Sequence, residues 1–115
     1  MVMNSDHGLA TYGTLGPGRP NHHQLSGLRG TWSVGWVRGR LFDEGWRARQ
    51  GFPGLVLDPD GEPVAVDVFA SGDLPHHWPR LDAFEGFGRR RVTTGVSTPE
   101  GVLQACIYVL ASGRA

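Results

Sequence analysis

The sequence contains a single cysteine, Cys106, and no long apolar run. One cysteine excludes an internal disulfide and favours a reducing compartment. The first twenty residues carry no apolar stretch like that of a signal peptide or a membrane span. Eleven basic and eleven acidic side chains cancel, so no excess charge indicates a nucleic-acid or membrane partner. We therefore expect a cytoplasmic protein that binds neither nucleic acid nor membrane.

Glycine and proline, by contrast, are abundant, with 18 and 8 residues among 115. They divide the chain into short pieces, as is typical of a fold with many turns and short strands. The length fits one domain, and 39% apolar with 19% charged residues is an ordinary globular composition. We expect a single domain over residues 1–115.

Six segments have the composition or the alternation of β-strands. They are residues 9–12, 31–42, 55–57, 64–69, 91–96 and 102–110. The last segment is apolar on both faces and is expected to be central and buried. Two short helices are indicated, one beginning at Asn21 and one running from Asp73 to Gly86 with Pro79 as a candidate break. The pattern predicts an α+β fold, in which a curved or partly closed mixed sheet carries short helices at its rim.

Two finer predictions concern pairing and faces. Residues 58–61, with the sequence Asp-Pro-Asp-Gly, predict a hairpin between the third and fourth strands. In the second strand Trp32, Val34 and Trp36 share one face, which we expect to be the core face. In the fourth strand three valines share one face and Asp67 lies on the other.

The first candidate site is the sequence Tyr12-Gly13-Thr14-Leu15. A strand that passes through glycine into a loop leaves backbone N–H groups free, and such groups can hold a carboxylate or an oxyanion. The plainer alternative is a tight turn that needs glycine for its backbone conformation, and spacing alone favours this alternative.

The second candidate is Glu85, which stands beside Phe84 at the end of the second predicted helix. A carboxylate that is partly desolvated in such a place can exchange protons near neutral pH. The alternative is a solvated surface glutamate beside a helix stop, which is the commoner case for this residue type.

Two histidine pairs and a basic run are weaker candidates. Neighbouring residues of a helix point about 100° apart, so His22-His23 and His76-His77 chelate one ion poorly. The chain has no His-Glu-x-x-His motif and no cysteine cluster, and we predict neither a metal nor a cofactor. Residues 89–91, three arginines, are interpreted as the solvated start of a strand that could still attract an acidic substrate.

Five segments in order resemble motifs of the γ-glutamylcyclotransferase-like family. Residues 12–15 resemble its opening Tyr-Gly-Ser/Thr-Leu motif, and residues 20–25 resemble the helix start that follows, above all in γ-glutamylamine cyclotransferases. Residues 39–43 and 52–55 resemble Gly-x-Leu-Tyr-Asp and Tyr-Pro-Gly-Leu. Residues 81–86 resemble the Leu-Asp-x-x-Glu-Gly block that carries the family's catalytic glutamate. The resemblance covers residues 9–110.

The resemblance implies a small barrel-like mixed α/β fold without a cofactor. It implies that Tyr12, Gly13, Thr14 and Leu15 line the substrate cavity and that Glu85 is the general acid/base. The reaction would release 5-oxoproline from a small γ-glutamyl amine or γ-glutamyl amino acid by intramolecular aminolysis.

Two departures from the family pattern leave other functions open. Family members often have Gly-Glu-Leu/Val-Tyr where this chain has residues 66–69, with Asp67 in place of the glutamate, and often have tyrosine where it has Arg89. One alternative is therefore a non-catalytic binding module on the same fold. Another is an interaction protein that uses its tryptophans at an interface. These are Trp32, Trp36, Trp46 and Trp78.

Overall fold

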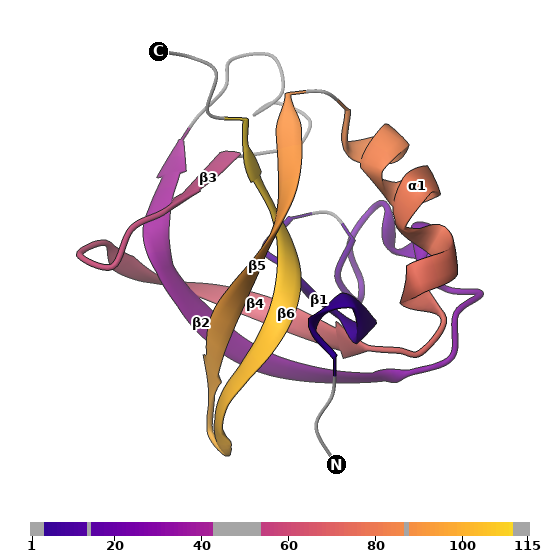
Figure 1. The fold of residues 1–115 in the computed structure, drawn as a ribbon, viewed down its shortest axis with the longest axis horizontal. Helices are drawn as coiled ribbons and strands as arrows, with labels where there is room; N and C mark the ends of the chain where they lie inside the picture. The colour runs from indigo at the N-terminus through magenta and orange to yellow at the C-terminus, as the bar shows by residue number, and fades with distance from the viewer. Residues whose placement is uncertain (1–3, 14, 43–53, 87, 112–115) are drawn as a thin grey trace.

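The computed structural model describes residues 4–13, 15–42, 54–86 and 88–111. Thr14, Trp46 and parts of the segments 39–43 and 52–55 lie outside the described residues. Within the described residues the chain forms six strands, one α-helix and two 3-10 turns (Figure 1). In chain order they are η1 (Ser5–His7), β1 (Gly8–Thr11), η2 (His22–Gln24), β2 (Thr31–Phe42), β3 (Gly54–Leu57), β4 (Glu62–Ala70), α1 (Leu74–Glu85), β5 (Arg89–Thr98) and β6 (Gly101–Leu110).

Five of the strands close into a small barrel. Around it the order is β2, β4, β1, β6 and β5, and β5 returns to β2 through the pair Trp36 and Ser97. The pairing of β1 with β6 is parallel and the other pairings are antiparallel. Strand β3 extends the sheet from β2, and α1 lies outside the barrel wall (Figure 1). The predicted α+β architecture with a mixed, barrel-like sheet is confirmed.

Strand β2 has the bounds that the sequence predicts, but the predicted core face is wrong over its middle. Val34 is 61% exposed and Trp36 is 40% exposed, whereas Gly35 and Val37 are buried. The inner face is narrow, because a methyl group placed on Gly35 would lie 2.5 Å from the carbonyl oxygen of Ser97. Glycine has no apolar side chain to indicate burial. The alternation of large side chains therefore marks the outer face as the core face.

The predicted hairpin between β3 and β4 does not form, because both strands pair with β2. Strand β4 pairs with residues 31–39 of β2, and β3 pairs with residues 39–42. The turn at residues 58–61 is present, but β2 lies between the strands that it connects. Strands β3 and β4 therefore pair with β2 and not with each other. The close approach of the turn to β2 requires glycine at position 61, since a methyl group there would lie 2.6 Å from the carbonyl oxygen of Gly39.

Two apolar clusters lie on the two sides of the barrel wall. The inner cluster contains side chains from all six strands, and the outer cluster lies between the wall and α1. Neighbouring residues of one strand alternate between the clusters: Ala10 and Ile107 belong to the inner one, and Leu9 and Tyr108 to the outer one. Residues 105–109 of β6 are all buried, which confirms the prediction of a central last strand.

Helix α1 packs on the barrel through Leu74, Trp78 and Leu81, which are buried at helical spacing. Pro79 does not divide it. This proline is exposed, so the backbone acceptor that it leaves without a donor is on the water side. No described helix is long and apolar enough to cross a membrane.

Asn21 and Asp73, the residues at which the two predicted helices begin, do not cap them with their side chains. Asp73 precedes α1 without a capping bond, and its Oδ2 accepts a hydrogen bond from the backbone N–H of Arg29 at 2.9 Å instead. Asn21 also makes no capping bond, and the predicted helix after it is the single 3-10 turn η2. The aspartate thus ties the start of α1 to the segment that leads into β2.

Candidate active site

Glu85 is the last residue of α1, and its side chain is half-buried. Gly86 ends the helix with a φ of 87° and donates its backbone N–H to the carbonyl oxygen of Asp82 at 3.0 Å. A positive φ favours glycine, so the Glu-Gly sequence fixes where the helix stops. Half-burial fits both an acid/base carboxylate and the surface glutamate beside a helix stop that was the plainer alternative.

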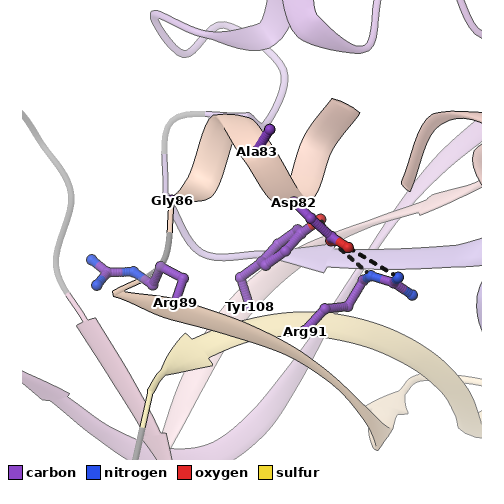
Figure 2. Close-up of a pocket in the computed structure, with 6 residues that line it drawn as sticks. All are labelled: Asp82, Ala83, Gly86, Arg89, Arg91 and Tyr108. Carbon is purple, nitrogen blue, oxygen red and sulfur yellow. Dashed lines mark hydrogen bonds and ion pairs between the residues drawn. The ribbon is translucent and has the colours of Figure 1, made fainter. Parts of the chain in front are cut away.

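One turn before Glu85, the Asp82 carboxylate receives three hydrogen bonds. Arg91 donates from Nε at 2.9 Å and from Nη2 at 3.2 Å, and the Tyr108 hydroxyl donates to Oδ1 at 2.6 Å. The Arg91 guanidinium also lies 4.4 Å from the centre of the Trp78 ring, and its Nη1 lies 3.9 Å from Cys106 Sγ. Figure 2 shows Asp82, Tyr108 and Arg91 converging below the helix. We call these three residues the anchor.

The charges of the anchor are fixed by its contacts. The hydrogen bond from Arg91 holds the pKa of Asp82 below its ordinary value, and the bond from Tyr108 acts in the same direction. Burial, followed by the bond to Asp82, raises the pKa of Tyr108 well above its ordinary value, so the phenol stays protonated. The charge of Glu85 contributes to the same rise. Its carboxylate is therefore within electrostatic reach of the Tyr108 hydroxyl.

Tyr12 connects the opening bend to the anchor. It follows β1, is half-buried against the inner cluster, and donates its hydroxyl to the carbonyl oxygen of Tyr108 at 2.8 Å. Tyr108 therefore binds the Tyr12 side chain through its backbone and Asp82 through its own side chain. The structure thus joins two sequence-predicted parts of the site, the bend and the end of α1, through a residue of β6 that the sequence did not single out.

The bend itself differs from the glycine-requiring turn considered above. Gly13 does not have a positive φ, and a methyl group placed on it would meet no atom within 4 Å. Its N–H makes a long contact of 3.4 Å to Thr11 Oγ1. Leu15 is 2% exposed in the outer cluster, and its carbonyl oxygen accepts a hydrogen bond from His22 Nδ1 at 3.1 Å. The Leu15 side chain is therefore core, and only its backbone could contact a ligand.

A pocket of about 530 Å³ adjoins the last turn of α1 (Figure 2). It is lined by Asp82, Ala83, Gly86, Arg89, Arg91 and Tyr108. Of the described residues, neither Glu85 nor the bend lines it. Two of the lining residues are nonetheless close to Glu85 in the sequence. Gly86 follows the glutamate directly, and Asp82 precedes it by one helical turn.

The sequence suggests that the arginine run, residues 89–91, is the solvated start of a strand. The run does begin β5, but it is not solvated throughout. Arg89 is 9% exposed and Arg91 is half-buried, and both line the pocket, whereas Arg90 is exposed. The error arises because residues two apart in a strand share one face, and this face lies under α1. Composition alone does not reveal which face a helix covers.

Asp67, one of the two departures from the family pattern, lies beside the bend. Its partner across the sheet on β1 is Thr11. A methyl group placed on Gly16 would lie 2.6 Å from Asp67 Oδ2, so the carboxylate packs against the loop that follows the bend. Asp67 thus contacts the segment that leads away from the candidate site.

The tryptophans do not gather into one exposed surface within the described residues. Trp78 is 5% exposed, and Trp32 is half-buried and stacks on Phe69 with ring centroids 4.7 Å apart. Trp36 is the exposed one. Among the described residues, no group of three or more His, Cys, Asp or Glu side chains is arranged to hold a metal ion.

Comparison with known proteins agrees with this architecture. The family model described as "Gamma-glutamyl cyclotransferase, AIG2-like" matches residues 9–115. No curated protein matches the chain.

Solved structures share the fold. An uncharacterised protein from Pyrococcus horikoshii is 27% identical with a TM-score of 0.65, over 91% of this chain and 78% of that one. YkqA from Bacillus subtilis is 28% identical with a TM-score of 0.70, over 90% of this chain and 35% of that one. An AIG2-like protein from Mus musculus is 22% identical with a TM-score of 0.70, over 92% and 78%. At 22% identity the mouse protein supports the fold alone.

Proposed function

Because the chain belongs to the γ-glutamyl cyclotransferase, AIG2-like family, we propose that it releases 5-oxoproline from a small γ-glutamyl amine or γ-glutamyl amino acid. The observation that carries this proposal is the half-buried Glu85 at the end of α1, one turn after Asp82, which hydrogen bonds of Tyr108 connect to the Tyr12 bend. The single cysteine supports a cytoplasmic location as part of the same proposal.

The reaction is an intramolecular aminolysis. The free α-amine of the γ-glutamyl group attacks its own γ-carbonyl carbon, a C–N bond forms, and the original amide C–N bond breaks. Attacking and attacked atoms belong to one molecule, so holding the bent conformer removes much of the entropic barrier. This chemistry requires neither a serine or cysteine nucleophile nor a cofactor.

Glu85 is the proton carrier in this proposal. It takes a proton from the attacking amine and returns it to the departing nitrogen, so the products are 5-oxoproline and a free amine. Positioned acid/base help of this kind accelerates a reaction by about 10²–10⁴-fold. Asp82 does not suit the role, because its carboxylate is held ionised by Arg91 and Tyr108.

The bend holds the other end of the substrate. Backbone N–H groups of Gly13, Thr14 and Leu15 bind the substrate's α-carboxylate or the oxyanion that develops on its carbonyl. Tyr12 shapes the wall between them and Glu85. Since the Leu15 side chain is buried, its part in binding is confined to the backbone.

The test is to incubate the protein with a panel of γ-glutamyl compounds and to detect 5-oxoproline. The panel contains γ-glutamyl amino acids, γ-glutamyl polyamines and γ-glutamyl-lysine side-chain conjugates. We expect turnover of at least one compound, and loss of this turnover in Glu85→Gln with an unchanged melting temperature. Full activity of Glu85→Gln would remove the assigned role.

A non-catalytic binding module on the same fold is the second candidate. It is favoured by Arg89, which occupies a buried place in the pocket lining where the resembling enzymes often have tyrosine. The same panel separates the candidates. A module would bind a γ-glutamyl compound in calorimetry without releasing 5-oxoproline.

A further inference from the structure

Tyr108 is the point where the two halves of the proposed site meet. It accepts the Tyr12 hydroxyl at 2.8 Å through its backbone and donates its own hydroxyl to Asp82 at 2.6 Å. These contacts join residues that are 96 and 26 positions apart in the chain. We infer that the anchor, formed by Asp82, Arg91 and Tyr108, is a positioning unit that holds Glu85 in register with the bend. This inference rests on the proposed function.

The end of α1 needs such a support from the barrel. A helix frays at its last turn, where the final carbonyl groups have no partner within the helix. Pro79 lies inside α1 and has no N–H to donate, which removes one hydrogen bond before the last turn. Asp82 and Glu85 are three residues apart and therefore lie on neighbouring parts of the same helical face. Holding Asp82 against β5 and β6 fixes the turn from which Glu85 projects.

The anchor is suited to holding and not to proton transfer. Two nitrogens of Arg91 contact the two oxygens of Asp82, which is a planar and directional arrangement. Trp78 lies 4.4 Å from the guanidinium and restricts its movement. The Tyr108 phenol stays protonated because burial and Asp82 raise its pKa. All three groups keep one charge state at neutral pH.

The anchor also places two opposite charges about one helical turn from Glu85. Among the described residues, the titratable and charged groups that line the pocket at this end of α1 or pack beside it include Asp82 on the helix, Arg89 and Arg91 on β5, and Cys106 and Tyr108 on β6. Asp82 and Arg91 cancel as a pair. Removing either charge alone leaves the other uncompensated near Glu85, with opposite consequences for the ionised carboxylate.

The experiment uses four variants of the full chain and the best compound of the panel. They are Tyr108→Phe, Asp82→Asn, Arg91→Met and the double variant Asp82→Asn with Arg91→Met. The control is Asp58→Asn, which breaks the ion pair between Asp58 and Arg40 on another part of the surface. For each variant kcat, KM, the pH profile of kcat/KM and the melting temperature are measured.

We expect kcat to fall about 10–100-fold in Asp82→Asn and Arg91→Met, as a displacement of about 1 Å can cost 10²-fold. Tyr108→Phe should lose about 10-fold, because its ring still packs and one hydrogen bond is gone. The control should keep wild-type kinetics.

The pH profile separates positioning from a general loss of stability. In Asp82→Asn the uncompensated Arg91 favours the ionised form of Glu85, so the acidic limb should move to lower pH. In Arg91→Met the uncompensated Asp82 should move the limb to higher pH. The double variant should return the limb to its wild-type position while kcat stays low. A general loss of stability would move none of these limbs, and a low kcat in the double variant separates positioning from the effect of charge.

The outcomes distinguish the two proposals. If the wild type releases 5-oxoproline, Glu85→Gln is inactive, and the folded anchor variants keep wild-type kcat and limbs, the positioning role is wrong and the function stands. If Asp82→Asn fails to fold, Tyr108→Phe decides the matter by the same criteria. A wild type that converts no γ-glutamyl compound overturns the function and the positioning role together.

Discussion

Two arginine–aspartate ion pairs have almost the same length and very different surroundings. Arg91 Nε lies 2.9 Å from Asp82 Oδ1, and Arg40 Nε lies 3.0 Å from Asp58 Oδ2. The Arg91 side chain is 28% exposed and the Arg40 side chain 62%, whereas the aspartates have the opposite order, with Asp82 at 44% and Asp58 at 27%. The first pair is bidentate and is extended by a tyrosine and a tryptophan, whereas the second is a single contact in the turn between β3 and β4. The length of an ion pair therefore does not by itself indicate how much the pair contributes to stability or function.

The difference lies in what each pair connects. The Asp82 pair joins the last turn of α1 to two strands and, through Tyr108, to the bend. The Asp58 pair connects β2 to a turn that is already closed by a backbone hydrogen bond from Gly61 to Asp58 at 2.9 Å. Exposed pairs of this kind contribute little, because water and salt screen them. We expect the first pair to carry stability and function and the second to carry neither.

The largest expected effect on stability comes from Arg91→Ala. It removes two charge-assisted hydrogen bonds to Asp82 and the contact with Trp78. With Asp82 partly exposed and able to regain water, we expect a loss of about 1–2 kcal/mol in the free energy of unfolding. Urea unfolding followed by tryptophan fluorescence measures it. A loss no larger than that of Arg40→Ala would contradict the comparison.

A smaller effect is expected from Tyr108→Phe. The ring remains in the outer cluster, so only the hydrogen bond to Asp82 is lost, at a cost of about 1 kcal/mol. The backbone bond to Tyr12 does not involve the removed hydroxyl and should persist. Thermal unfolding beside wild type gives the result. An unchanged midpoint would show that the phenol is not a working part of the anchor.

The pH dependence of stability sharpens the comparison further. Arg91 lowers the pKa of Asp82 in the folded protein from its ordinary value of 3.8, so the carboxylate contributes stability above that pH. The contribution is lost as the pH falls through the lowered pKa. The difference in stability between wild type and Asp82→Asn should be full above about pH 4 and shrink below it. Midpoints measured between pH 2 and pH 7 test this, and a gap that widens toward low pH would reverse the assigned sign.

The smallest expected effect is that of Asp58→Asn. The pKa of Asp58 is also lowered, first by the hydrogen bond from the backbone of Asp60 and then by Arg40, but an asparagine side chain can accept the same backbone bond. We expect no measurable change in melting temperature at physiological salt. Calorimetry at 0.15 M salt provides the check. A shift as large as that of Asp82→Asn would remove the distinction between the pairs.

The sequence predicts where the strands lie along the chain better than it predicts which strands pair with each other. The long alternating segment gives β2 its bounds, and the apolar run gives β6 its central place. The turn at residues 58–61 has strong local chemistry, but local chemistry does not specify that β3 and β4 both pair with β2. The sequence pattern assigns Trp36 to the core, but Trp36 is exposed. The buried face carries glycine here, which has no side chain to indicate burial.

The candidate site shows the same limit. Glu85 and the bend are found through contiguous motifs, and hydrogen bonds of Tyr108 connect the bend to Asp82, which precedes Glu85 by one turn. The anchor is less visible, because Asp82 and Arg91 are nine residues apart and belong to different elements. Tyr108 stands among apolar neighbours and reads as a core residue. Its two hydrogen bonds depend on the closed barrel and on α1 packing over it, which no local pattern encodes.

Release of 5-oxoproline by wild type and by Glu85→Gln, compared at saturating substrate with equal amounts of folded protein, tests the central claim most directly. The account predicts turnover by the wild type and a fall of at least about 10²-fold in kcat for the variant, with ligand binding retained. Equal rates for the two proteins, or no release by the wild type from any γ-glutamyl compound, would contradict it.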